Sequence, residues 1–239
     1  MIQKLLLLII LTLLVPGCKN RSETTSEKEN QPIQIVGAMK NVMWQGKLEG
    51  SILLDTLTEK EHLYGLGPES FLKGELLIND GQAFVSRVVS DSSMMVEKTW
   101  EVSAPFFVYG TVPQWNQLPL PKEIKTLKDL ERFISENAPH PEKPFAFKLE
   151  GRVNSAVIHI QNLPEGTKVS SPKEAHQGQT NYTLTNEAVT IVGFYSTRHQ
   201  GIFTHHDSFL HMHLITKEET KMGHLDEAIL QDMILYLPK

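Results

Sequence analysis

The sequence contains little cysteine and no block of positive charge. Cys18 is the single cysteine among 239 residues, so the chain cannot form an internal disulfide, and a disulfide-stapled scaffold is excluded. The formal net charge is -5 and carries no basic cluster, so we expect no nucleic-acid partner. A glycine-rich phosphate loop is also absent, and we expect no organic cofactor. What remains is a chain long enough for one large or two small domains with a proper core.

The apolar run at the N-terminus is too short to span a bilayer comfortably. It extends from Leu5 to Val15 after an early lysine, which is typical of a secretory signal. Leu-Val-Pro-Gly precedes Cys18 and resembles the lipobox of bacterial lipoproteins, with Pro16 an imperfect fit. We therefore predict a lipoprotein-type signal peptide over residues 1–18 and lipidation at Cys18. A plain signal peptide with an incidental cysteine is the alternative.

The residues after Cys18 predict how the exported protein is attached. Residues 19–32 are polar, charged and free of aromatic side chains, so they predict a flexible tether. The protein is then expected on the outside of a bacterial cell membrane, on its periplasmic or cell-surface side, held there only by the lipid anchor.

The folded part shows mainly strand patterns. Ile33–Gly46 is expected to form a first strand and turn, and two apolar runs that flank Asp80-Gly81 indicate a β-hairpin. The clearest helix begins at Thr126, which forms a variant of the capping box with Asp129. One face of this helix is apolar, with Leu127, Leu130, Phe133 and Ile134. We predict a mixed α/β fold of mixed, strand-rich sheets with few helices, in two halves, 33–143 and 144–239.

Three histidines near the C-terminus could share one metal ion. In the strand-like run Leu210–Ile215, His211 and His213 point to one face, while Leu210, Met212 and Leu214 point to the other. A hairpin reversing about Glu218 and Glu219 would set His213 opposite His224, within about 4.5–5.5 Å at Cβ. Three imidazoles with an open position are the ligand set of a catalytic zinc. The plainer interpretation is a solvated polar strand face.

The other histidines are weaker candidates. His205 and His206 precede the strand in an expected loop, and four more are expected on the surface: His62, His140, His176 and His199.

These residues resemble a known family. "HMHLI" followed after a polar turn by "MGHLD" is similar to the histidine signature of bacterial α-acetolactate decarboxylases. "LYGLGPESFLKGELLINDGQAF" resembles the family's GLGTF and GELI segments, and "APFFVYG", "LEG" and "TIVGFYS" follow in the expected order. The similarity extends from about Leu63 to Asp226.

The resemblance implies a fold and a chemistry. The family's fold is a pair of packed α/β domains with mixed sheets. A zinc ion would be bound by His211, His213 and His224, and Glu75 in "KGELL" matches the family's glutamate beside the metal. The implied activity is zinc-dependent decarboxylation of 2-acetolactate to acetoin and carbon dioxide. The metal would act as a Lewis acid and a carboxylic acid would deliver a proton.

Two features depart from the family pattern. His159 stands where the family has an arginine that can hold the substrate carboxylate, and a histidine offers no bidentate fork. We assign His159 to the catalytic site with Glu75, while Arg152 and Arg198 are stand-ins whose positions the sequence does not give. The family also continues past its last "LP" strand and returns another glutamate toward the metal, whereas this sequence stops at Lys239.

These departures leave a second class of function open. The chain could be a non-catalytic or substrate-shifted envelope lipoprotein that binds zinc and a small hydroxy or keto acid. A metal site that hydrolyses another substrate is a third interpretation, with no further motif behind it. A homodimer is compatible with the sequence, which does not determine the oligomeric state.

Overall fold

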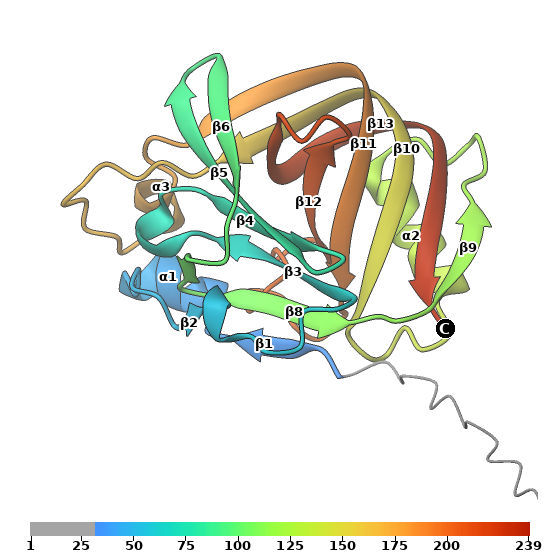
Figure 1. Cartoon of the computed structure of the whole chain (residues 1–239), viewed down its shortest axis with the longest axis horizontal. Coiled ribbons are helices and arrows are strands. Elements are labelled where there is room, and N and C mark those ends of the chain that lie inside the picture. The colour runs from blue at the N-terminus through green and yellow to red at the C-terminus, as the bar shows by residue number, and fades with distance from the viewer. Residues whose placement is uncertain (1–31) are drawn as a thin grey trace, which may run out of the picture.

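Two antiparallel sheets make up most of the computed structural model, which describes residues 32–239 (Figure 1). The first sheet has the strand order β1-β8-β3-β4-β5-β6. Its strands are β1 Gln34–Val36, β3 Leu63–Pro68, β4 Glu75–Asn79, β5 Gln82–Ser90, β6 Ser93–Lys98 and β8 Phe107–Thr111. A separate pair is formed by β2 Ile52–Leu53 and β7 Ser103–Ala104.

The second sheet carries the long, curved strands (Figure 1). Its order is β10-β11-β12-β13-β9, and β10 also pairs with β13, which closes four of the strands into a ring. The strands are β9 Trp115–Pro119, β10 Phe145–Ile160, β11 Thr180–Tyr195, β12 Leu210–Thr216 and β13 Met222–Pro238.

Helices are few and short. They are α1 Met39–Gln45, α2 Leu127–Asn137 and α3 Pro172–Ala175, with 3-10 turns η1 Leu54–Thr56 and η2 Ser70–Leu72. The predicted strand-rich α/β class is therefore confirmed. One detail differs: every pairing between the named strands is antiparallel, where we expected mixed sheets. Short turns join many of these strands, and a tight turn can only return the chain antiparallel.

Several local predictions are confirmed. β4 and β5 form the hairpin around Asp80-Gly81, and both turn residues have positive φ, as this tight turn requires. Thr126 caps α2 in a reciprocal capping box with Asp129. The stretch Ile33–Gly46 was expected to form a strand and a turn. The strand β1 is present, but Met39–Gln45 form the helix α1, which was not predicted.

None of the helices between residues 32 and 239 is long and apolar enough to cross a membrane. The predicted signal peptide, the lipidated Cys18 and the predicted tether up to residue 31 lie outside the described residues. The predicted division of the chain near Pro144 stays a prediction; the first sheet uses residues 34–111 and the second uses residues 115–238.

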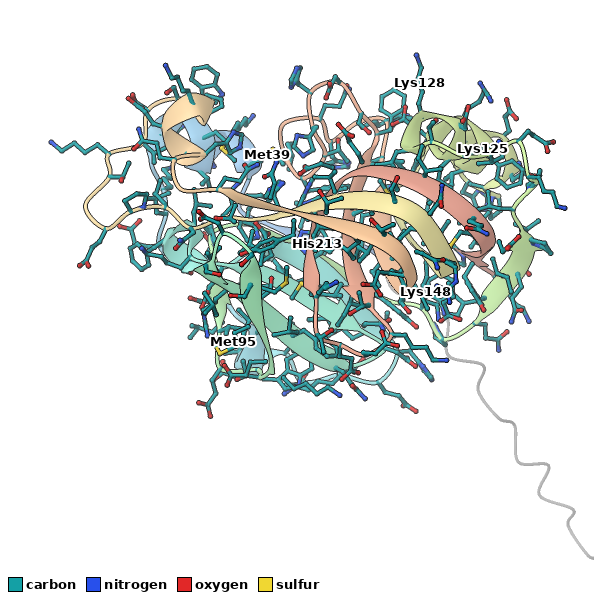
Figure 2. All side chains as sticks on the ribbon, turned by 90° about the horizontal axis from the view of Figure 1, so that it is seen from above. Met39, Met95, Lys125, Lys128, Lys148 and His213 are labelled. Carbon is teal, nitrogen blue, oxygen red and sulfur yellow. The ribbon has the colours of Figure 1, made fainter. Side chains whose placement is uncertain are left out.

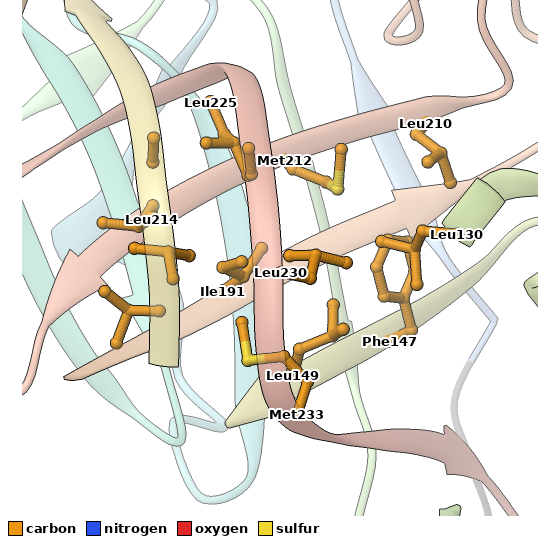
Figure 3. Packing of buried hydrophobic residues seen from close by; sticks show 14 of the residues in the cluster. Leu130, Phe147, Leu149, Ile191, Leu210, Met212, Leu214, Leu225, Leu230 and Met233 are labelled. Carbon is orange, nitrogen blue, oxygen red and sulfur yellow. The ribbon is translucent and has the colours of Figure 1, made fainter. Parts of the chain in front are cut away.

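The main core lies on one face of the long strands, where α2 covers it (Figure 3). It includes Leu130 from α2, Phe147 and Leu149 from β10, Ile191 from β11 and Leu214 from β12. Side chains on the other face, such as Val192 and Ile215, pack with residues of the first sheet. The two sheets therefore meet face to face.

Truncating Leu130 tests how much the packing of α2 against the core contributes to the free energy of unfolding. This side chain is completely buried, so we expect Leu130→Ala to lower the free energy of unfolding by about 2–5 kcal/mol. The matched control is Leu53→Ala, because Leu53 is 57% exposed and its loss should change stability by no more than about 0.5 kcal/mol. Urea unfolding of both variants measures the difference, and equal midpoints would contradict this assignment of the core.

Candidate metal centre

The three predicted histidines come together as expected. β12 and β13 pair with His213 directly opposite His224, and Glu219 lies in the turn with positive φ. The ring centroids of His211, His213 and His224 lie 5.1 to 5.6 Å apart. All three are buried, with His213 fully enclosed near the middle of the molecule (Figure 2). Their neighbours Leu210, Met212 and Leu214 face the main core, so the predicted division of the strand into two faces is correct.

Glu75 and His159 lie at the same place. Glu75 opens β4 in the first sheet, and its carboxylate oxygens lie 3.6 Å from His213 Nε2 and 4.0 Å from His159 Nε2. His159 on β10 is paired with His224 on β13, and the two rings stack at 4.5 Å. The site is thus built where β4 of the first sheet packs against β10, β12 and β13 of the second.

Asp226 is a site residue that the sequence reasoning missed. Its carboxylate accepts a hydrogen bond from His159 Nδ1 at 2.8 Å and one from His224 Nδ1 at 3.2 Å. The ligand atoms of His159, His224 and Asp226 all lie within 4.8 Å of one another. Its spacing of two residues from His224 could have identified it in the sequence, because residues two apart on a strand share a face.

Gln161 and His205 also line the site. The backbone N–H of Gln161 donates to Glu75 at 3.3 Å, and its side-chain nitrogen lies 3.4 Å from His159 Nε2. His205 Nε2 lies 3.2 Å from His224 Nε2. His205 had been a weak candidate, and Gln161 could have been found from its spacing of two from His159.

The two arginines considered as stand-ins lie elsewhere. The guanidinium of Arg152 contacts Asn186, and Arg198 is exposed. Neither side chain lines the cavity at the histidines, whose walls include Glu75, His159, Gln161, His205, His211 and His224. Of Arg152, His159 and Arg198, only His159 lines this cavity.

Burial sets the protonation of these groups. It lowers the pKa of His211 and His213 well below the ordinary value, and the neighbouring His224 adds to the effect. Burial and the nearby His159 lower the pKa of His224 to about 3. These three imidazoles are therefore neutral at neutral pH, which is the form that binds a metal.

The two carboxyl groups behave in opposite ways. Burial raises the pKa of Glu75 well above its usual range, although the Gln161 N–H opposes the shift. Burial would also raise the pKa of Asp226, but the hydrogen bonds from His159 and His224 outweigh it and hold that pKa low. Glu75 is therefore suited to carry a proton and Asp226 to carry a negative charge.

The unpaired nitrogens indicate what the site can hold. Within residues 32–239, His211 Nδ1 and His213 Nε2 are buried and have no hydrogen-bond partner. A buried polar atom without a partner costs about 1–3 kcal/mol, so such atoms call for a ligand. His211, with His224 and Glu75, lines a cavity of about 30 Å³, which is room for an ion or a water molecule. Neutral imidazoles with free nitrogens around a space of this size fit a divalent transition metal.

Known proteins resemble this chain in sequence and in fold. The family model described as alpha-acetolactate decarboxylase matches residues 35–237. The chain belongs to this family. The alpha-acetolactate decarboxylase of Lactococcus lactis subsp. cremoris is 24% identical over 189 residues, which cover 78% of this chain and 75% of that protein.

Solved structures show that the fold is shared with other members and relatives of the family. The alpha-acetolactate decarboxylase of Bacillus subtilis superposes with a TM-score of 0.71 at 23% identity, covering 87% of this chain and 86% of that one. A Staphylococcus aureus protein, described as of unknown function and similar to alpha-acetolactate decarboxylase, superposes with a TM-score of 0.72 at 17% identity, covering 86% and 84%. The family assignment made from the sequence motifs is confirmed.

Proposed function

We propose that the protein decarboxylates 2-acetolactate to acetoin at a zinc ion held by His211, His213 and His224. The observation that carries the proposal is the buried cluster of neutral imidazoles, two of them with unpaired nitrogens, beside a buried glutamate. Membership of the alpha-acetolactate decarboxylase family supports the substrate and the reaction. Zinc is chosen because it prefers imidazole nitrogen at four-coordinate sites with an open position.

The chemistry requires an electron sink and a proton donor. When the bond from C2 to the carboxylate breaks, carbon dioxide leaves and the electron pair moves into the neighbouring keto group, which gives an enediolate. A bound divalent cation supplies Lewis-acid stabilisation of that developing charge. A proton must then reach one carbon of the enediolate to give acetoin. Glu75 can donate it, because burial raises the pKa of its carboxyl group and so favours the protonated form.

His159 is proposed to orient the substrate. Its Nδ1 is bound to Asp226, so its Nε2 is turned toward Glu75 and Gln161 at the cavity. Because its Nδ1 proton is already donated to Asp226, Nε2 can donate to the substrate carboxylate only in the doubly protonated form of the ring. That contact would replace the bidentate grip of an arginine with a single hydrogen bond. Asp226 fixes both His159 and His224, which is the usual role of a carboxylate behind a metal-binding imidazole.

Asp226→Asn tests that role. We expect metal affinity to fall about 10- to 100-fold, because an amide holds the imidazole N–H groups more weakly than a carboxylate. Competition with a chromophoric chelator measures the affinity, and Glu227→Gln is the matched control because Glu227 is the adjacent carboxylate and makes none of the hydrogen bonds described for Asp226. A loss as large as that caused by removing one of the three proposed ligands would make Asp226 a ligand itself.

The activity assay compares metal-loaded and metal-free protein with racemic 2-acetolactate. We expect acetoin formation well above the spontaneous background with zinc, its loss after chelation and its return on adding zinc. Acetoin at the background rate from fully loaded protein would refute the proposed reaction.

A second function is favoured by two observations at the site. Neither Arg152 nor Arg198 reaches the cavity, and the cavity itself holds little more than an ion. A protein that binds zinc and a small hydroxy or keto acid without turnover would fit these features. Calorimetric binding of such an acid to loaded protein that forms no acetoin would decide for this alternative.

Export and lipid anchoring remain a proposal from the sequence. The lipobox-like stretch before Cys18 supports attachment to the bacterial envelope. Labelling of growing cells with a fatty-acid analogue should mark the protein and should fail to mark Cys18→Ser. A protein that is released unlabelled would contradict the anchor.

A further inference from the structure

His205 makes an unusual contact with a proposed metal ligand. Its Nε2 lies 3.2 Å from Nε2 of His224, and the two rings are inclined by 74°. His224 donates its Nδ1 proton to Asp226, so its Nε2 carries a lone pair that faces His205. The nitrogen that His224 would offer to a metal is therefore the one that His205 approaches.

The distance between the two nitrogens suits a shared ion. With zinc–nitrogen bonds of about 2.0–2.1 Å, two ligands of a tetrahedral ion lie about 3.3–3.4 Å apart. The observed 3.2 Å is close to that separation. A direct hydrogen bond from His205 to His224 has a similar length, but it would occupy the His224 lone pair and exclude a metal there. If His224 binds a metal, His205 must either bind the same ion or move away.

The loop that carries His205 is anchored on both sides of it. The first N–H groups of α1, on Met39 and Lys40, donate to the carbonyls of Ile202 and Gly201 at 2.8 and 2.9 Å. After His205, the carboxylate of Glu131 in α2 accepts hydrogen bonds from Ser208 Oγ and the Phe209 N–H at 2.7 and 2.8 Å. These contacts hold the loop against both helices, so the fold fixes the backbone on both sides of His205.

His205 also separates two spaces. It lines the cavity of about 30 Å³ at the histidines, and it lines a pocket of about 470 Å³ on the other side, next to α2. His224 borders both spaces as well. A small organic acid fits the larger pocket but not the smaller cavity, so an acid in the larger pocket lies next to His205 and His224.

We propose that His205 is the fourth protein ligand of the metal in the substrate-free protein, and that an incoming hydroxy or keto acid takes its place. The proposal rests on the metal centre proposed above. With His211, His213 and His224, His205 would supply a set of four imidazole nitrogens, the number of ligands that zinc prefers. Substrate oxygen atoms then displace His205 from the side of the larger pocket. In this arrangement the metal stays protected from other ligands until an acid that can chelate it arrives.

Cobalt binding tests this proposal independently of activity, because cobalt(II) reports its ligands through its visible spectrum. Wild-type protein, His205→Ala and His206→Ala are titrated with cobalt(II), and His206 is the matched control because it is the adjacent, exposed histidine. We expect His205→Ala to bind cobalt at least about tenfold more weakly, since even a residue behind a ligand contributes that much. Its spectrum should show a site in which water replaces a nitrogen. His206→Ala should match the wild type, and circular dichroism should show all three proteins folded.

The possible results separate the two proposals. If the wild type and His205→Ala bind cobalt with equal affinity and equal spectra, His205 is no ligand, while the metal centre stands. If the wild-type protein binds no cobalt, or binds it equally well after His224→Ala, the metal centre fails and the role of His205 fails with it. Addition of glycolate, a small hydroxy acid, should change the wild-type spectrum toward that of His205→Ala. A wild-type spectrum that glycolate leaves unchanged would contradict displacement.

Discussion

His213→Ala is expected to lower metal affinity by roughly 10²–10³-fold. A structural zinc site with four ligands gains about 10–16 kcal/mol, so one ligand contributes about 2.5–4 kcal/mol, and every 1.4 kcal/mol is tenfold. His213 is fully buried and its Nε2 has no hydrogen-bond partner within residues 32–239. We therefore expect its whole contribution to appear in metal binding.

The same substitution should change how zinc affects stability. Zinc stabilises the wild type by about 2.7 kcal/mol when its free concentration is 100 times Kd, because it binds only the folded protein. His213→Ala should show little of this gain at the same concentration. Without zinc the variant should unfold near the wild type, since it loses a buried group whose polar atoms are poorly satisfied.

Chelator competition and thermal unfolding with and without zinc measure both effects. His140→Ala serves as the control because His140 lies on the surface and contacts only Glu142 among the described ion pairs. A His213→Ala protein that still binds zinc as the wild type does would remove this side chain from the metal centre. His213→Gln covers the case in which the alanine variant does not fold.

Glu75→Gln should lower kcat by about 10²–10⁴-fold and leave metal binding nearly unchanged, because general acid catalysis contributes about this much. Glutamine has almost the same shape and can still accept the Gln161 N–H at 3.3 Å. It cannot deliver the proton that the enediolate needs. The side chain is buried beside His213 and His159, so water is a poor substitute for it.

Steady-state acetoin formation and chelator competition on the same protein samples separate catalysis from binding. Glu97→Gln is the matched control, because Glu97 belongs to the same sheet and is half-exposed, with Arg87 3.5 Å away. If Glu75→Gln keeps the wild-type kcat, Glu75 is not the proton donor. If it loses the metal instead, Glu75 acts mainly as a ligand.

Much of the site followed from side-chain alternation along the strands. The period of two placed His211 and His213 on one face, and the polar turn at Glu218 and Glu219 fixed the pairing of His213 with His224. The capping box at Thr126 and the turn at Asp80-Gly81 are equally local signals, and both elements formed as expected. Local chemistry decides such features, so the sequence alone was enough to find them.

Asp226 could not be placed with the same certainty. The register of β10 against β13 shifts between Val157 and Ile158, and Asp226 falls in the resulting bulge without a partner residue. The bulge turns its carboxylate toward both His159 and His224, and such an irregularity depends on how two distant strands fit together. Motif matching predicted that His159 holds the substrate, which stays a prediction, whereas its contact with Asp226 follows from tertiary packing.

His205 and α1 illustrate a second limit. α1 is seven residues long, which is too short to be stable alone, so it depends on contacts that no local pattern shows. Its first N–H groups hold the loop in which His205 lies. A histidine expected in a loop thus became part of the site through a helix that was expected to be a turn.

The enantiomer of the acetoin formed is the most direct test of the central claim. Spontaneous loss of carbon dioxide from racemic 2-acetolactate yields racemic acetoin, whereas a proton delivered by one fixed carboxyl group reaches one face only. Chiral chromatography of the product formed by zinc-loaded protein should therefore show a single enantiomer. Racemic acetoin formed at the spontaneous rate would contradict the account, since the buried cluster would then not be a decarboxylase site.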